Sequence, residues 1–259
     1  MGSPPETPRA EIAPGVFITV EELNVPMEAT GRMISVEIHL DTPGTELVFR
    51  PFDESALERG RHFRLAFADW IIRNNDYLAL INGTRYYPGY RWRSYPGANV
   101  LAVESIVIDG RWSHQHKHSV MIWWDDQWRG QVELSKPPRG AVLERAVHGI
   151  GVQTVQVRDA AVGGIASSGE GELISRSFIG IDPDQNIVWL IAFENVTERS
   201  MAWHAVQQGV VHGGQVDSGS ATNLLLGRKS PGWRPFPGIR NLRPVANYLA
   251  VRHRAPEET

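Results

Sequence analysis

The residues best suited to chemistry follow a short apolar stretch in the C-terminal part of the chain. Asp217 is followed at once by three small residues, Ser218, Gly219 and Ser220. Small residues let backbone N–H groups approach a ligand closely, and glycine adopts dihedral angles that other residues avoid. An aspartate in this place can position an attacking water, act as a carboxylate base or bind sugar hydroxyls. The same pattern also fits a helix cap or turn formed by Asp217 and Ser218.

A second candidate is the loop that follows an apolar stretch ending at Ile81. Asn82 and Gly83 open this loop. It continues with arginine and aromatic residues, which are Arg85, Tyr86, Tyr87, Tyr90, Arg91, Trp92 and Arg93. Aromatic rings stack on sugar rings, and a guanidinium group binds phosphate or carboxylate through two parallel hydrogen bonds. The alternative is a β-turn at Asn82–Gly83 with cation–π packing at the surface.

Three histidines, His114, His116 and His118, alternate with other residues. In a strand these positions face the same side, and neutral imidazole is a common metal ligand. Neighbouring side chains on one face of a strand are about 6.5 to 7 Å apart, which is wide for two ligands of one ion. The pattern therefore favours a solvated strand or loop face, and a metal-dependent hydrolase built on these histidines is the alternative.

Composition removes several classes of protein. The 259 residues include no cysteine, which excludes disulfides, thiolate metal sites and cysteine nucleophiles. The formal net charge of −3 lacks the positive field that nucleic-acid binding requires, so no nucleic-acid partner is expected. The sequence contains no Walker loop, no dinucleotide-binding glycine motif, no G-x-S-x-G and no H-E-x-x-H. We therefore expect any catalysis to use oxygen and nitrogen groups, and we assign no cofactor and no metal ligands.

The chain is expected to form one domain. No apolar run approaches the roughly eighteen residues of a membrane helix, so no membrane span is predicted. Residues 1–14 are interpreted as a flexible leader without a signal-peptide profile, residues 15–252 as the domain, and residues 253–259 as a disordered tail. Compartment and oligomeric state stay open.

Apolar patterning predicts a fold in which strands dominate. Helical spacing occurs at Phe63–Arg73 and Glu198–Gln208, and the turn residues of Asp182–Asn186 predict a hairpin. The predicted strands are Val16–Val20, Met33–Leu40, Glu46–Pro51, Tyr77–Ile81, Ser105–Ile108, Val120–Trp124, Gly130–Leu134, Ser177–Ile181, Ile187–Phe193 and Leu224–Leu226. Strands with few helices and no regular βαβ alternation predict an α+β domain with mixed, largely antiparallel sheets.

The order of these motifs resembles that of the phosphodiester glycosidase domain family, over roughly Val16 to Val251. The segments that carry the resemblance are Ile81-Asn82-Gly83, Ser105–Gly110, Arg176–Asp182 (R-S-F-I-G-I-D), Val216–Thr222 (V-D-S-G-S-A-T) and Arg243–Leu249 (R-P-V-A-N-Y-L). The family typically shows R-T-A-I-G and L-D-G-G-G-S-[ST]-T in the third and fourth of them. Here Ser218 stands where a glycine is usual, the glycine run is one residue shorter, and Glu194-Asn195 replaces a frequent D-G.

The resemblance implies hydrolysis of a sugar 1-phosphodiester, with a small phosphorylated sugar or glycan as the partner. It assigns the leaving phosphate to Arg176 and the developing positive charge at the anomeric carbon to Asp217. Asn82 would hold hydroxyl or phosphate oxygens, and Glu194 is a second carboxylate to test. The implied substrate-binding residues are Ser218, Gly219, Ser220, Gly83, Arg85 and Tyr86. Relatives are often secreted or lumenal, and a module that binds glycan without cleaving it is the competing interpretation.

Overall fold

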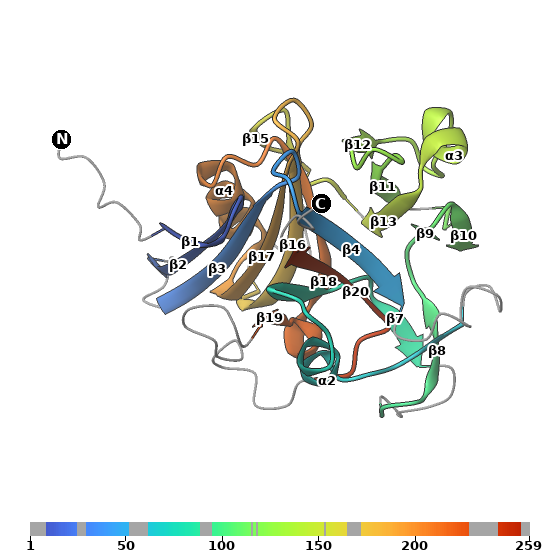
Figure 1. The fold of residues 1–259 in the computed structure, drawn as a ribbon, viewed down its shortest axis with the longest axis horizontal. Coiled ribbons are helices and arrows are strands. Elements are labelled where there is room, and N and C mark those ends of the chain that lie inside the picture. Colours follow the sequence, from blue (N-terminus) through green and yellow to red (C-terminus); the bar gives the residue numbers. More distant parts are fainter. Residues whose placement is uncertain are drawn as a thin grey trace, which may run out of the picture.

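A computed structural model describes residues 9–24, 30–51, 62–88, 95–114, 116–117, 119–152, 154–164, 172–227 and 243–254. In this part of the chain the strands form sheets of eight, five, four and three strands, in which neighbouring strands are antiparallel (Figure 1). The largest sheet has the order β1 (Arg9–Ala13), β2 (Val16–Asn24), β3 (Thr30–His39), β17 (Ile187–Val196), β16 (Ile174–Asp182), β18 (His212–Ser218), β14 (Val157–Arg158) and β15 (Ala161–Val162).

The four- and five-stranded sheets pack against the largest sheet, and the three-stranded sheet lies beyond β4 (Thr45–Pro51) and β20 (Asn247–His253), at the lower right of Figure 1. The four-stranded sheet consists of β19 (Leu224–Leu226), β6 (Ala79–Asn82), β20 and β4. The five-stranded sheet consists of β10 (Arg111–His114), β9 (Ile106–Ile108), β13 (His148–Val152), β11 (Val120–Trp124) and β12 (Gly130–Glu133). The three-stranded sheet consists of β5 (His62–Arg64), β8 (Asn99–Ala102) and β7 (Tyr86–Pro88). Among the described residues the helices are α2 (Ala68–Arg73), α3 (Ala141–Arg145), α4 (Glu198–Gln207) and the 3₁₀ turn η1 (Gly219–Ala221).

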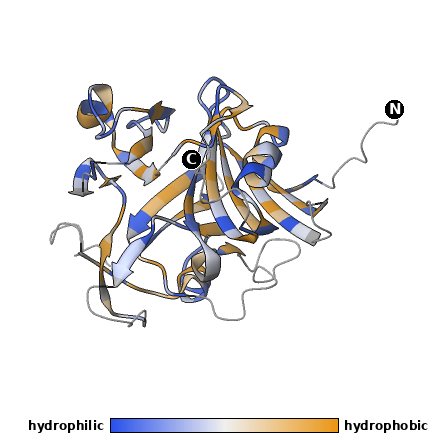
Figure 2. Ribbon diagram, turned by 180° about the vertical axis from the view of Figure 1, so that it is seen from behind, coloured by the Kyte–Doolittle hydropathy of each residue, from blue (hydrophilic) through white to orange (hydrophobic). Residues whose placement is uncertain are grey.

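The main hydrophobic core lies between the largest sheet and the four- and five-stranded sheets. Side chains alternate between the two faces of a strand, so every second residue of β16 and β17 enters this core. Ile179, Leu190, Leu249 and Trp124 bring together β16, β17, β20 and β11 there. Figure 2 shows the hydrophobic colour concentrated on these strands. We call the face of the largest sheet that lines this core its inner face.

The opposite, outer face of the largest sheet is covered by α4 (Figure 1). Phe178 and Trp189 of the sheet pack there with Met201 and Ala205 of the helix. The helix begins after Thr197, whose Oγ1 accepts a hydrogen bond from the Ser200 backbone N–H at 3.1 Å. Neighbouring residues of β16 therefore enter two different environments, the inner core and the layer beneath α4.

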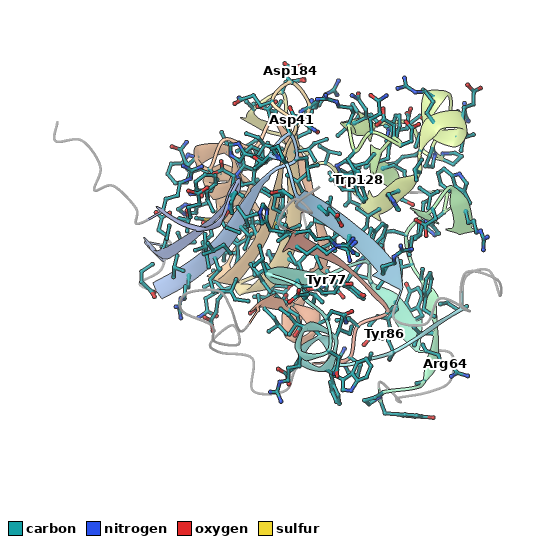
Figure 3. The ribbon with its side chains drawn as sticks, in the orientation of Figure 1. Asp41, Arg64, Tyr77, Tyr86, Trp128 and Asp184 are labelled. Atoms are coloured by element: carbon teal, nitrogen blue, oxygen red, sulfur yellow. The ribbon has the colours of Figure 1, made fainter. Side chains whose placement is uncertain are left out.

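The predicted hairpin between β16 and β17 is confirmed. Asp182 Oδ1 accepts hydrogen bonds from the backbone N–H groups of Asp184 (2.9 Å) and Gln185 (3.1 Å), and Asn186 adopts a φ of 52°. Asn186 Nδ2 also donates to Asp41 Oδ1 at 2.9 Å, in the turn that follows β3. Figure 3 shows Asp41 and Asp184 close together at this end of the sheet.

The domain is β-rich, with largely antiparallel sheets as expected. Each stretch predicted as a strand overlaps a strand, and α4 matches its predicted helix within one residue. In the described residues the α-helices are few and short, so "β-rich" describes the fold better than α+β. No helix in these ranges is long and apolar enough to cross a membrane.

The helix predicted over residues 63–73 is only partly correct. Its first part is strand β5, and α2 starts at Ala68. Phe63 and Leu65 are fully buried while Arg64 between them is exposed, which is the two-residue period of a strand. The apparent helical period arose because this strand and the short helix α2 follow each other closely.

The predicted domain boundaries also shift. We expected residues 1–14 to be a flexible leader, but residues 9–13 form β1, which pairs with β2. Arg9 anchors this strand, since its Nη2 lies 2.7 Å from Glu37 Oε1 and its guanidinium lies 3.7 Å from the centroid of the Phe17 ring. At the other end β20 includes His253. Residues 1–8 and 255–259 lie outside the described ranges.

Candidate active site

Asn82 ends β6 at the junction between the four-stranded sheet and the largest sheet. Its side chain is buried, and its Oδ1 accepts hydrogen bonds from Ser177 Oγ (2.6 Å) and from the Asn223 backbone N–H (2.8 Å). Ser177 lies on β16, and Asn223 lies between η1 and β19. The amide of Asn82 therefore joins three separate parts of the chain at one point.

Asp217 lies beside this junction. It is the register partner of Ser177 across β16 and β18, so both side chains lie on the inner face. Asp217 is only 8% exposed, and its Oδ1 accepts a hydrogen bond from the Ser218 backbone N–H at 2.7 Å. The sequence-predicted residues Asn82 and Asp217 thus reach the same place, with Ser177 between them.

Burial raises the pKa of Asp217 from its ordinary value of 3.8 to about 7. The hydrogen bond from the Ser218 backbone lowers the pKa and therefore opposes this shift. The negative charge of Glu104 raises the pKa further, whereas Arg85 and Arg243 lower it. Asp217 can therefore exchange its proton near neutral pH, as acids and bases in active sites do.

Arg85 and Glu104 form an ion pair near Asp217. Arg85 Nε donates to Glu104 Oε1 at 3.0 Å, and Arg85 Nη2 donates to the same oxygen. Glu104 is buried, and its Oε2 has no hydrogen-bond partner among the described residues. Burial raises the pKa of Glu104 while Arg85 lowers it. This arrangement leaves one buried carboxylate oxygen available beside the Asp217 carboxyl.

Gly83 and Asn247 fix the start of the loop after Asn82. Gly83 N–H donates to the Asn247 carbonyl at 2.8 Å, and Asn247 Oδ1 accepts from the Thr84 backbone N–H at 3.0 Å. A Cβ at Gly83 would lie 1.6 Å from Asn247 Oδ1, so only glycine fits. Tyr86 Oη donates to the Pro244 carbonyl at 2.8 Å and ties the loop to the segment before β20 (Figure 3).

The small residues after Asp217 end β18 and begin η1. Gly219 has a φ of 65°, a conformation that favours glycine, and among the described residues a Cβ built on it would meet nothing within 4 Å. Ser218 is partly exposed, and the Ser220 side chain lies outside the description. Just beyond, Thr222 Oγ1 and Asn223 Oδ1 are buried without a hydrogen-bond partner among the described residues.

Arg176 does not join this group. It precedes Ser177 on β16, so its side chain points to the outer face, where Phe178 packs beneath α4. Arg176 is 3% exposed and donates hydrogen bonds to the Val196 carbonyl, the Gln215 side chain and the Glu172 carbonyl. We expected its guanidinium to face the leaving phosphate, but the alternation of the strand places it on the other side of the sheet.

Glu194 lies near the end of β17, next to β3. Its cross-strand partner is Arg32 on β3. On the other side of β3, Arg32 is the register partner of Glu22 on β2. Partial burial raises the pKa of Glu194, with Arg32 lowering it and Glu22 raising it. Its charge interactions are thus with β2 and β3, whereas those of Asp217 are with Glu104 and two arginines.

The three histidines do not form one strand face. His114 is the last residue of β10, and His116 lies beyond the end of that strand, with its backbone N–H donating to Ser105 Oγ at 2.8 Å. His118, like Arg91 and Arg93, lies outside the described residues. The alternating pattern therefore does not continue on one strand, because β10 ends at the first histidine. Within the described ranges no group of three His, Asp or Glu side chains is placed to hold a metal ion.

Sequence reasoning assigned no role to Glu104, Ser177, Asn223 or Asn247. Ser177 and Asn247 lie inside the motifs R-S-F-I-G and R-P-V-A-N-Y, which were recognised as motifs without a function for these positions. Glu104 immediately precedes a predicted strand, and no local pattern marks it, because its partner Arg85 is distant in the sequence.

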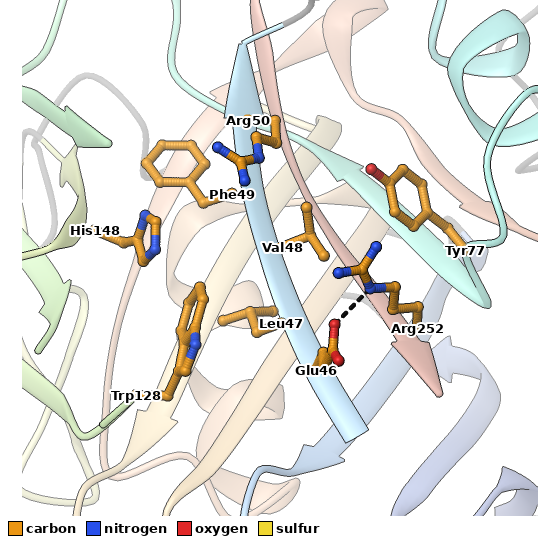
Figure 4. A pocket seen from close by; sticks show the side chains of 9 residues that line it. All are labelled: Glu46, Leu47, Val48, Phe49, Arg50, Tyr77, Trp128, His148 and Arg252. Carbon is orange, nitrogen blue, oxygen red and sulfur yellow. Dashed lines mark hydrogen bonds and ion pairs between the residues drawn. The ribbon is translucent and has the colours of Figure 1, made fainter. Parts of the chain in front are cut away.

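A hollow of about 230 Å³ lies along β4, away from these residues (Figure 4). The rings of Trp128 and His148 stack there with centroids 4.4 Å apart, and burial lowers the pKa of His148 to about 4. The remaining lining residues are Glu46, Leu47, Val48, Phe49, Arg50, Tyr77 and Arg252. Arg252 is paired with Glu46, and Arg50 is paired with Asp109.

This β-rich fold occurs in solved structures of other proteins. A hypothetical protein from Synechocystis has a TM-score of 0.67 at 14% identity over 93% of this chain, which spans 62% of that protein's chain. The catalytic domain of zebrafish N-acetylglucosamine-1-phosphodiester alpha-N-acetylglucosaminidase, in a form auto-inhibited by its pro-peptide, has a TM-score of 0.65 at 14% identity, covering 96% of this chain and 88% of that one. No family model and no curated protein matches the sequence. The likeness at this identity is one of fold.

Replacing Asn82 by alanine is expected to lower the free energy of unfolding by about 2 to 3 kcal/mol, because the Ser177 hydroxyl and the Asn223 N–H would lose their shared buried acceptor. Urea unfolding followed by circular dichroism measures the effect. Ser177→Ala is the matched comparison, since it removes one of the two bonds and should cost less. Equal stability of Asn82→Ala and wild type would contradict this account of the junction.

Proposed function

We propose that this protein hydrolyses the glycosidic bond of a sugar 1-phosphodiester and releases the sugar and a phosphomonoester. The observation that carries the proposal is the convergence of a buried carboxyl, Asp217, with the Asn82 amide and the Arg85–Glu104 pair. The fold shared with the zebrafish N-acetylglucosamine-1-phosphodiester glucosaminidase domain supports the same reaction class. As in the phosphodiester glycosidase family that the motifs resemble, the site would act without a metal or cofactor.

Asp217 would act in its ionised form. As the bond between the anomeric carbon and the phosphate oxygen breaks, the bonding electron pair leaves with the phosphate, and positive charge develops on the sugar. Burial destabilises the ionised carboxylate of Asp217 before this charge appears. The developing positive charge then stabilises the carboxylate strongly, because the local dielectric constant is low. Water then adds to the anomeric carbon and loses a proton to solvent.

The phosphate would be held by Arg85 and Arg243 in place of Arg176. The positive charges of both arginines lower the pKa of Asp217, which supports this assignment, and Arg243 is exposed. The remaining expected substrate contacts are Ser218, Gly219 and Ser220 with the sugar or phosphate oxygens, and Gly83 and Tyr86 as residues that shape the loop. Because a phosphomonoester is a good leaving group, one carboxylate is sufficient in this scheme, and Glu194 has no assigned step.

The test is incubation of the purified chain with methyl-phosphodiester derivatives of N-acetylglucosamine and of other hexoses at their 1-position. Chromatography detects free sugar, and a phosphatase-coupled phosphate assay detects the phosphomonoester. We expect both products in equal amounts, with unchanged yield in the presence of EDTA. Tight glycan binding in calorimetry without product would instead support the binding-module interpretation, and loss of product with EDTA and in His116→Ala would support a metal-dependent hydrolase.

A further inference from the structure

Two β-bulges flank β16 at the level of Arg176. On one side Ile174 is opposite Val196 but Arg176 is opposite Phe193, so β17 carries one extra residue in between. The extra length is taken up near Asn195, whose φ of 51° lies in the left-handed region. This bulge changes the direction of β17 at its end.

The second bulge lies in β18. Ser177 is opposite Asp217 and Phe178 is opposite Gln215, which leaves Val216 without a register partner on β16. A bulge changes the direction in which the next side chain points and increases the local twist. The orientation of Asp217 therefore depends on how this bulge is held.

The guanidinium of Arg176 bonds to the chain at both bulges. Its Nε donates to the Val196 carbonyl at 3.2 Å, just past the bulge of β17. Its Nη1 donates to Gln215 Oε1 at 2.7 Å, just before the bulge of β18. Its Nη2 donates to the Glu172 carbonyl at 3.1 Å, on the segment that leads into β16. A planar guanidinium with donors in fixed directions is suited to hold three segments of the chain in one arrangement.

Two further buried side chains complete this contact. The backbone N–H of Gln215 donates to Gln156 Oε1 at 2.8 Å, and Gln156 Nε2 donates to Glu198 Oε1 at 2.6 Å. Gln156 and Glu198 are both buried, and the negative charge of Glu198 favours the charged form of Arg176. The N–H group at the bulge is thus satisfied by a side chain rather than by a neighbouring strand.

We propose that Arg176 is a positioning residue, which from the outer face locks the bulges of β17 and β18 and so holds Ser177 and Asp217 in place on the inner face. The inference rests on the proposed function only for its effect on catalysis. Its structural content, the placement of Asp217, can be measured without substrate.

The test uses Arg176→Lys, which keeps the charge but not the three directed bonds, and Gln215→Met, which removes the acceptor at the β18 bulge. The measurement is the titration of the Asp217 carboxyl carbon by carbon-13 NMR, with Asp217→Asn used for assignment. A carboxyl released from its buried position is better hydrated, so its pKa should fall from about 7 by about one unit or more in both variants. Loss of a nearby positive charge alone would raise the pKa of Asp217. The direction of the pKa shift therefore distinguishes a displaced Asp217 carboxyl from a lost charge interaction.

Glu198→Gln is the matched control, because it removes a charge from the same buried group while keeping a hydrogen-bond acceptor for Gln156. The pKa of Asp217 should stay at its wild-type value in this variant. If the wild type hydrolyses the diester, Arg176→Lys and Gln215→Met should also lower kcat by about 100-fold with little change in KM. An unchanged pKa of Asp217 in both folded variants, as judged by circular dichroism, would overturn the inference. An inactive wild type with shifted pKa values would refute the proposed function and leave the positioning role supported.

Discussion

Asp217→Asn is expected to lower kcat for sugar 1-phosphodiester hydrolysis by about a thousandfold, the scale seen when a group that stabilises transition-state charge is removed. The substitution keeps the size of the side chain and an oxygen that can accept the Ser218 N–H, so the local backbone should persist. It removes the negative charge that would face the developing positive charge on the sugar. KM should change little, because the lost interaction strengthens only as the bond breaks.

The pH profile gives this prediction a second readout. Since burial raises the pKa of Asp217 to about 7 and the ionised form is the proposed active one, kcat/KM should rise between pH 5 and pH 8 with an apparent pKa near 7. The residual activity of Asp217→Asn should lack this rise. Asp184→Asn, at the exposed tip of the β16–β17 hairpin, is the matched control and should retain the wild-type rate. Wild-type rates in Asp217→Asn would refute the role of this carboxyl.

The strands and the junction of Asn82 with Asp217 lay within reach of sequence reasoning. Each strand has a hydrophobic pattern that follows from alternation, and the motifs V-D-S-G-S and I-N-G mark strand ends that open into polar loops. The resemblance to the family made both residues candidates for one site, but whether these two ends lie together was left open. The local sequence does not determine it, because the pairing of β16 with β18 and of β6 with β20 joins segments far apart in the chain.

The face on which each side chain lies was harder to predict. Arg176 and Ser177 are neighbours, and a shift of one residue in register exchanges which of them reaches the site. The bulge at Val216 adds one residue to β18, so counting along that strand from Gln215 gives the wrong face for Asp217. The resemblance to the family and the chemistry of guanidinium made Arg176 a phosphate ligand, whereas its position makes it part of the layer beneath α4.

The Asp217 carboxyl should lower the free energy of unfolding at neutral pH, since a group placed for catalysis is often unfavourable for folding. Below its ordinary pKa of 3.8 Asp217 is protonated in both the folded and the unfolded chain. Between pH 4 and 7 the unfolded chain releases this proton while the folded protein retains it, so the free energy of unfolding falls as the pH rises. Above about pH 7 the folded form also ionises, and the loss attributable to this group is complete at about 4 kcal/mol.

Asp217→Asn removes this dependence, because an amide does not ionise. Urea unfolding of both proteins from pH 4 to pH 9 measures the difference in free energy, in which the titration of all other groups largely cancels. The two proteins should be nearly equal at pH 4, and the variant should be increasingly more stable up to about pH 7, after which the difference stays constant. Parallel stability curves over the whole range would show that Asp217 has the same pKa in the folded and the unfolded chain. This result would contradict the raised pKa on which the catalytic proposal relies.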